Sequence, residues 1–459
     1  GLVARGFVSA AEDLGVNLKA DALESGGEDM PDAYLMCPVR PSQWSANIVQ
    51  APAGACGNSA RLFLVVFALL VGFRSSVNGF TRFSVFFQSI ARRLAHLPMT
   101  MFYDDASLQD LRSARGEGQR LMNDLLGDIG GGFKPSKSQQ MAGRADFLGL
   151  VHDVSLAFNS QRVSFAPRPA LVEKVCALTS TALSDSLPPT VAGKLLGVRA
   201  FVESGTYARV GRAGQGALVR RVYAEHCAAR LGWPLSLDDD DQSLRESLRV
   251  TMLIMAAIPD RVMELAASPR PPLLIASDAQ ASVEAGVSGA FLIVDPIDGT
   301  RWGRVWTFDK NDLAAIGFPD WPCLGPVEEK RNPISSAEAA VVAATYVIIR
   351  DECSELIRKR DVVHWVDNTA ALHSFVKGGS KCTAIDRACN ILWCSSFGSG
   401  FVPWLEYVPS KANWSDGASR DLLNDQFARD HGFSLEVGRF PRFLWTCRLT
   451  ELWRALVHV

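Results

Sequence analysis

Four acidic residues in the second half of the chain have the types and positions that suit metal-dependent phosphoryl transfer. In chain order they are Asp278 after an apolar run, Glu338 in a helical pattern, Asp367 after a second apolar run, and Asp416 at a helix start. Strand ends meet at one edge of a parallel or mixed sheet, and a packed helix can add a carboxylate, so these acids can converge. Converged carboxylates repel one another unless cations neutralise them. We therefore expect two Mg²⁺ ions about 3.5–4 Å apart, replaceable by Mn²⁺, and phosphodiester hydrolysis.

Each of these acids also has an ordinary structural role open to it. Glu338 closes the sequence Ser335-Ser-Ala-Glu338, which is typical of a capping box at a helix start. Asp416 can cap a helix, Asp367 can form an Asx turn, and Asp278 can end a strand in solvent. The catalytic interpretation depends on all of them falling in one element order.

The elements that must position these acids begin after Ser268–Pro272 (SPRPP), a composition that predicts an extended linker and a domain boundary. Three strands joined by short turns come first, the second turn carrying Asp298-Gly299. The whole order is βββαβαβα. The predicted strands are 273–278, 287–294, 301–308, 361–366 and 404–408, and the predicted helices are 335–358, 368–377 and one from 416. His364, inside a strand of buried type, is interpreted as a core histidine.

Four segments of this region resemble the D, E, D and D motifs of retroelement ribonuclease H domains. They are Ile275-Ala-Ser-Asp278-Ala, Ile334-Ser-Ser-Ala-Glu338, His364-Trp-Val-Asp367-Asn and Tyr407-Val-Pro-Ser-Lys-Ala-Asn-Trp-Ser-Asp416-Gly-Ala-Ser-Arg. The resemblance implies a ribonuclease H-like domain built on a mixed sheet. It also implies that the substrate of this domain is the RNA strand of an RNA–DNA hybrid. Many enzymes of this fold carry a histidine before the last acid, whereas 408–414 has none. The role of that histidine is therefore either unfilled or served by another residue, for which Lys411 is the candidate.

A second set of acids lies upstream, where the apolar run from Pro98 ends in Asp104 and Asp105. Adjacent carboxylates at a strand end repel each other, and a polar hairpin turn is the ordinary interpretation. The flanking segments 22–28 (ALESGGE) and 106–113 (ASLQDLRS) contain few strand-forming residues. We therefore expect neither segment to form a good strand.

The surroundings of these acids resemble the palm of reverse transcriptases. The matching segments are Asp29-Met-Pro-Asp-Ala-Tyr34, Val71-Gly72-Phe-Arg-Ser-Ser-Val-Asn-Gly-Phe80, Asp104-Asp105, Phe133-Lys-Pro-Ser-Lys137 and Phe147-Leu-Gly149. The resemblance implies that Asp29 and Asp104 hold two Mg²⁺ ions, with Asp105 as an outer ligand. It places Tyr34 and Gly72 at the nucleotide, and Lys137 at the pyrophosphate leaving group, an ordinary solvated lysine being the alternative. The partners it implies are an RNA template, a DNA primer and dNTPs. The fingers subdomain, which should precede Asp29, is expected to be largely missing.

Between the two acidic regions lies a stretch rich in basic residues, with Glu203 as its single acid. A local basic stripe suits a channel for a nucleic-acid duplex, because phosphate contacts supply most of the affinity. The ordinary interpretation is a solvated helix face. The stripe consists of Lys194, Arg199, Arg209, Arg212, Arg220 and Arg221.

Composition limits the class of protein. The 459 residues include 47 Lys and Arg against 49 Asp and Glu, a net charge of -2 that excludes a basic nucleic-acid-coating protein. Ten cysteines without a C-x-x-C pair argue against a structural zinc site or a secreted disulfide scaffold. The longest apolar run, 62–73, is shorter than the about 20 residues of a membrane helix, and it predicts a buried strand or a core segment. We expect no membrane partner and an intracellular location, in the cytoplasm or nucleus.

These patterns predict an α/β (α+β) multidomain chain. The expected parts are a partial polymerase palm at 1–165, a mostly helical thumb and connection at 166–270, a ribonuclease H-like domain at 271–425 and a helical tail at 426–459. The pattern is most similar to DIRS-like, tyrosine-recombinase retrotransposons, with gypsy-like relatives as the alternative. The predicted function is RNA-directed DNA polymerase with ribonuclease H activity. Two alternatives stay open: a decayed, non-catalytic relic, and a stand-alone nuclease of the same fold.

Overall fold

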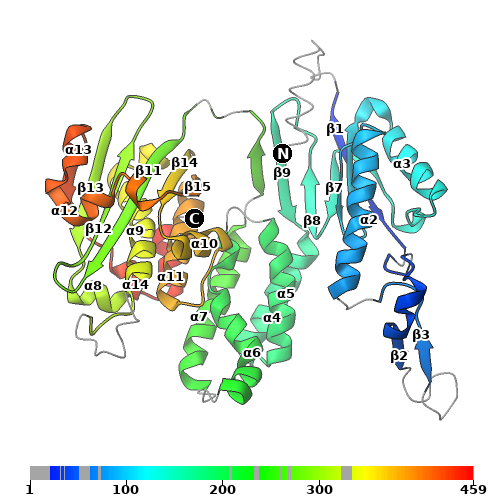
Figure 1. The fold of residues 1–459 in the computed structure, drawn as a ribbon, viewed down its shortest axis with the longest axis horizontal. Coiled ribbons are helices and arrows are strands. Elements are labelled where there is room, and N and C mark those ends of the chain that lie inside the picture. Colours follow the sequence, from blue (N-terminus) through cyan, green and yellow to red (C-terminus); the bar gives the residue numbers. More distant parts are fainter. Residues whose placement is uncertain are drawn as a thin grey trace. The chain divides into compact units, whose positions relative to one another are not determined.

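The computed structural model describes residues 21–31, 33–35, 37–50, 62–70, 74–205, 209–231, 237–258, 260–266, 268, 270–321 and 333–457. The chain divides into two compact units (Figure 1). The first unit is Gly1–Arg168 with Val262–Ala266, and the second unit is Pro169–Arg261 with Ala267–Val459. Both mix helices with sheets, so the predicted α/β class is confirmed. In the described part of the chain, every helix is too short or too polar to cross a membrane.

The main sheet of the first unit contains the two segments that composition marked as poor strands. Its strand order is β4 (Met99–Phe102), β5 (Asp105–Leu111), β1 (Leu23–Asp29) and β6 (Gln139–Ala142). The expectation for 22–28 and 106–113 was therefore wrong, since β1 pairs with β5 along its whole length. The glycines of β1 have a packing reason: a Cβ on Gly26 would lie 3.0 Å from the Gln139 carbonyl oxygen and 3.0 Å from the Met141 sulfur. Close approach of β6 selects glycine there.

Helices α2 (Arg74–Arg93) and α3 (Glu117–Asp128) pack with this sheet around Phe80, Met99 and Met122. A second sheet has the order β10 (Arg261–Glu264), β9 (Arg162–Pro167), β8 (Leu150–Asp153) and β7 (Arg144–Phe147). A two-stranded sheet joins β2 (Ile48–Gln50) to β3 (Phe63–Val65). Strand β3 is exposed and none of the residues 62–70 is buried, so the prediction of a buried strand or core segment at 62–73 was wrong for its described part.

The second unit begins with the segment predicted to be helical. It forms α4 (Pro169–Ser184), α5 (Pro189–Ser204), α6 (Gln215–Leu231) and α7 (Leu237–Ala257). Their buried side chains, Leu195 and Leu248 among them, belong to the same hydrophobic core as the sheet that follows.

That sheet is mixed, as predicted for a ribonuclease H-like domain. Its order is β15 (Val402–Tyr407), β14 (Asp361–Val366), β11 (Leu273–Ser282), β12 (Gly286–Val294), β13 (Arg301–Thr307) and β16 (Ser434–Val437). Strands β11 to β13 form an antiparallel meander, while β14 runs parallel to β11, and β15 parallel to β14.

Helices cover both faces of this sheet. The long helix α9 (Ile334–Ile357) packs on β11 and against α11 (Thr383–Ser399), a helix that the sequence patterns did not predict. The short helix α12 (Asp416–Asp421) lies over β12 and β11 in a separate small core with Ala290 and Leu292. Two further helices, α8 (Lys310–Ala315) and α10 (Thr369–Lys377), follow β13 and β14.

The last segment is only in part the helical tail that we expected, because a strand interrupts its helices. After α13 (Gln426–Asp430) it forms β16, which pairs in parallel with β13 and extends the sheet. Leu435 of this strand packs against the small core under α12. Only then come α14 (Phe443–Thr446) and α15 (Leu449–Leu456). A four-residue strand that forms because it pairs with a neighbouring strand shows little hydrophobic periodicity in the sequence.

Candidate active site

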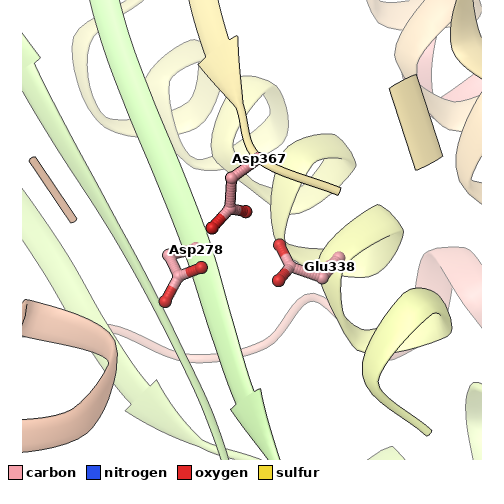
Figure 2. A group of neighbouring side chains, drawn as sticks. All are labelled: Asp278, Glu338 and Asp367. Carbon is pink, nitrogen blue, oxygen red and sulfur yellow. The ribbon is translucent and has the colours of Figure 1, made fainter. Parts of the chain in front are cut away.

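A gap between two parallel strands creates the site. Strand β11 pairs with β14 over Leu273–Ala276, and β14 ends at Val366 while β11 continues to Ser282. Asp278 therefore lies beyond the last residue of β11 that pairs with β14, and Asp367 directly follows the end of β14. The start of α9 brings Glu338 to the same opening (Figure 2).

Three carboxylates meet there. Asp278, Glu338 and Asp367 each place one oxygen within 4.8 Å of the others, a group that we call the buried carboxylate cluster. Asp278 is 3% exposed and Glu338 4% exposed. The capping-box role of Glu338 is wrong, because α9 begins at Ile334 with Pro333 at the N-cap. Ser335 is therefore already inside the helix, and Glu338 points to the other two acids.

Burial dominates the electrostatics of the cluster. It raises the pKa of Asp278 to about 7, against a hydrogen bond from Ser419 that favours the ionised form, and the charges of Asp367 and Asp416 add to the rise. Burial likewise raises the pKa of Glu338 well above its ordinary value, with Asp278 and Asp367 contributing. Ser419, on α12, was not predicted as a site residue; its hydroxyl donates to Asp278 Oδ2.

Two oxygens of the cluster lack a hydrogen-bond partner among the described residues. Glu338 Oε2 and Asp367 Oδ1 are buried and accept no hydrogen bond from any described residue. A buried acceptor without a partner costs free energy of about 1–3 kcal/mol or more, so such atoms call for an explanation. Carboxylate oxygens are the ligands that Mg²⁺ prefers, and a divalent cation would satisfy both oxygens and offset the repulsion. The residues present therefore fit a divalent metal.

Asp416 stands at the margin of the cluster. Its Oδ1 forms an ion pair at 2.6 Å with the guanidinium of Arg420, which lies one turn further along α12. Burial raises the pKa of Asp416, Arg420 opposes the rise and Asp367 adds to it. The loop before it is tied to β11, because Asn413 Nδ2 donates to the Ser277 carbonyl oxygen at 3.1 Å. Lys411 is exposed in the same loop.

The upstream acids, Asp29, Asp104 and Asp105, are called the hairpin acids below. Asp29 lies opposite Asp105 across β1 and β5, and Met30 N donates to the Asp104 carbonyl oxygen at 3.1 Å. Asp104 sits in the turn between β4 and β5, after Tyr103 in a left-handed conformation with φ 56°. Burial raises the pKa of Asp105, with Asp104 and Asp29 adding and Lys137 opposing.

Two other residues predicted for this site lie beside the hairpin acids. Lys137 Nζ forms a 2.8 Å ion pair with Asp29 Oδ2. The ring of Tyr34 packs 5.0 Å from that of Phe80. Burial raises the pKa of Tyr34, and the charges of Tyr103 and Asp104 add to the rise. Gly72 falls outside the described residues.

The basic stripe divides into buried and exposed members. Arg199 is 0% exposed and donates to Thr251 Oγ1 at 2.8 Å and to the Ala213 carbonyl oxygen at 2.6 Å, so its predicted contact with nucleic acid is wrong. Lys194 and Arg209 are exposed. The rest bond within the unit: Arg212 with the Lys377 carbonyl oxygen at 2.7 Å, Arg220 with Ser243 at 3.2 Å, and Arg221 with the Leu187 carbonyl oxygen at 2.7 Å.

Comparisons with known proteins give distant structural matches. No family model and no curated protein matches the sequence. Among solved structures, the chain is similar to foamy viral protease-reverse transcriptase dRH in complex with double-stranded DNA, with 11% identity, a TM-score of 0.37, and coverage of 83% of this chain and 56% of that chain. A second foamy viral protease-reverse transcriptase complex with double-stranded DNA has 13% identity, a TM-score of 0.36, and coverage of 83% and 67%. The chain thus spans just over half of the first of these proteins, and so distant a likeness assigns no role to any residue.

Proposed function

We propose that the second unit is a metal-dependent nuclease that cleaves a phosphodiester backbone, with the RNA strand of an RNA–DNA hybrid as its substrate. The buried carboxylate cluster carries this proposal, through the two oxygens that accept no bond from the described residues. Structural acids at strand ends normally face solvent or a partner, whereas these face one another. The choice of the hybrid rests on the sequence motifs around the four acids.

Asp278, Glu338 and Asp367 would hold the metal, with Asp416 completing the set from the margin. When bound, Mg²⁺ supplies charge neutralisation and Lewis-acid stabilisation of the phosphoryl group. The chain's own residues orient the acids. Ser419 fixes the carboxylate of Asp278, and Asn413 holds the loop of Asp416 on β11. Because the pKa of Asp278 is about 7, its carboxyl holds a proton over part of the neutral range, and metal binding must release that proton.

A second candidate function belongs to the first unit. The observation that favours it is the register of Asp29 opposite Asp105, with Asp104 in the adjoining turn. We propose that these acids are the metal ligands of an RNA-directed DNA polymerase, with Tyr34 at the incoming dNTP and Lys137 near the leaving group. An RNA template and a DNA primer would then be partners of the chain. The origin in a DIRS-like retroelement is part of this proposal and rests on the motifs alone.

The exposed basic residues suit the same substrates. Lys194 and Arg209 are exposed in the helical part of the second unit, where they can contact phosphates. Lys411 lies in the loop that carries Asp416, so we place it next to the scissile strand.

The decisive experiment is cleavage of labelled RNA in an RNA–DNA hybrid by the whole chain with Mg²⁺. We expect cleavage by the wild type and none by Asp367→Asn. Asp298→Asn is the matched control, because Asp298 is an exposed aspartate in the turn after β12 of the same sheet. Full activity of Asp367→Asn would refute the assignment of the site. Primer extension on an RNA template tests the second candidate. If the chain cuts hybrids without extending primers, the nuclease proposal stands and the polymerase proposal is wrong.

A further inference from the structure

A buried histidine lies on β14, three residues before Asp367, and both of its ring nitrogens are hydrogen-bonded. His364 is 0% exposed, its Nδ1 lies 3.0 Å from the Tyr346 hydroxyl, and its Nε2 lies 2.8 Å from Ser277 Oγ. Burial lowers the pKa of His364 to about 3, so the ring is neutral at physiological pH. One ring nitrogen then donates and the other accepts, and each hydroxyl rotates to match.

Ser277, His364 and Tyr346 form a buried hydrogen-bond network. Its three residues belong to the three elements that carry or precede the acids. Ser277 is the neighbour of Asp278 on β11, and His364 lies on β14, the strand that Asp367 follows. Tyr346 lies further along α9, the helix of Glu338. Figure 2 shows the three acids reaching the site from these same elements. Ser277 also connects to the fourth acid, because its carbonyl oxygen accepts the bond from Asn413.

A contribution to stability alone does not explain this buried hydrogen-bond network. Apolar residues of the same shape at buried hydrogen-bonded positions are often equally stable, because burying polar groups costs most of what their bonds return. The ring of Tyr346 is already held by stacking on Phe401, at 4.8 Å between centroids and 3° between planes. The hydrogen bonds are directional, so they fix how β11, β14 and α9 are oriented relative to one another.

We propose that His364 is a positioning residue that links β11, β14 and α9 and thereby sets the separation of Asp278, Glu338 and Asp367. The proposal rests on the metal-dependent nuclease function proposed above. Residues that orient metal ligands contribute typically about 10–100-fold to metal affinity or activity. His364 acts at one remove, through the backbones of the elements that carry the ligands.

The test measures Mn²⁺ affinity by electron paramagnetic resonance of the free ion, together with thermal unfolding, on the whole chain. His364→Leu removes both bonds and keeps an apolar side chain, and we expect its Mn²⁺ affinity to fall about tenfold or more. Tyr346→Phe and Ser277→Ala should each lower the affinity roughly two- to tenfold, and neither should add a further loss in the His364→Leu background. The control is Thr345→Val, which removes a buried hydroxyl of α9 whose 2.8 Å bond goes to the Val341 carbonyl oxygen.

The outcomes separate this inference from the proposed function. If the wild type binds Mn²⁺, Asp367→Asn abolishes that binding, and His364→Leu binds as tightly as Thr345→Val, the inference is wrong and the nuclease proposal stands. If the wild type binds no Mn²⁺ that depends on Asp367, both fall. If His364→Leu does not fold, Tyr346→Phe and Ser277→Ala decide: affinities equal to that of Thr345→Val overturn the inference, and losses at equal unfolding temperature support it.

Discussion

The buried carboxylate cluster and the hairpin acids use the same residue types in different surroundings. Asp278 and Glu338 are almost fully buried, and the cluster includes two acceptor oxygens without a partner among the described residues. The hairpin acids are half-buried, and the ammonium group of Lys137 lies 2.8 Å from Asp29. The buried carboxylate cluster therefore fits a cation from outside the chain, while the hairpin acids already have the ammonium group of Lys137 beside them.

The two groups also differ in how they are assembled. The hairpin acids lie on two neighbouring strands and the turn beside them, so the pairing of β1 with β5 within one sheet brings them together. The cluster draws one acid each from the elements β11, α9 and β14, so a helix must also pack on the sheet before its three acids meet. Packing of several elements around a site can hold unpaired charges out of water, because packing elsewhere offsets the cost. The comparison teaches that burial, more than the number of acids, distinguishes the group of acids that best fits a metal.

The largest effect that we predict concerns Mn²⁺ binding in the absence of nucleic acid. Glu338→Gln keeps the shape of the side chain and removes one charge from the cluster, so we expect the affinity to fall about 100-fold or more. Asp105→Asn, the matching change among the hairpin acids, should cost less than about tenfold, because Lys137 already compensates charge there. Titration with electron paramagnetic resonance of free Mn²⁺ measures both. Equal losses in the two variants would show that burial does not distinguish the sites.

The second prediction concerns pH and stability without metal. The pKa of Asp278 rises from its ordinary value of 3.8 to about 7, so the folded state binds a proton more tightly than the unfolded state. Stability from this group is full below about pH 4 and is lost as the pH rises to about 7. In EDTA, the unfolding transition of the second unit should move to lower temperature between pH 5 and pH 8, and Mg²⁺ should restore it. A transition that moves upward with pH in EDTA would contradict the assigned pKa shift.

The fold of the second unit could be predicted in large part from the sequence. The run 361–366 matches β14 from end to end, and 287–294 matches β12 within one residue. These strands are apolar and bounded by turn residues, so their signal is local. Strand β1 gave no such signal, because its glycines suit the close approach of β6 and only the folded sheet shows that need. Strand β16 is likewise made by its pairing with β13.

The site residues show the same division between local and non-local information. Spacing and element order placed Asp278, Glu338 and Asp367 at one opening, but the sequence gives no sign that Ser419 on α12 donates to Asp278. Charge patterning marked Arg199 as part of a surface stripe, whereas its guanidinium is enclosed by α5, α7 and the turn before α6. A sequence shows which residues carry charge, while burial and direction depend on contacts between distant segments.

A third, smaller effect is expected when the internal cation of the hairpin acids is removed. The ammonium group of Lys137 is exposed, and its pKa is raised by the bond to Asp29 and then by the charges of Asp105 and Asp104. Lys137→Met should therefore tighten Mn²⁺ binding at these acids roughly two- to fivefold. The measurement uses a Glu338→Gln background, so that the remaining sites are those of the first unit. Unchanged affinity would mean that Lys137 does not compete with the metal.

The smallest predicted effect is that of Arg420→Met, which removes the corresponding cation from the margin of the buried cluster. The side chain of Arg420 is 58% exposed and its guanidinium lies 2.6 Å from Asp416 Oδ1, so solvent screens much of its charge. It lowers the pKa of both Asp416 and Asp278, and without it both acids hold their protons to higher pH. We expect Mn²⁺ to bind about twofold more tightly at pH 8 and protons to compete more strongly at pH 6, which widens the ratio of the two affinities. A tenfold gain at pH 8 would make this exposed pair as important as burial, and the distinction between the two sites would then rest on their cations.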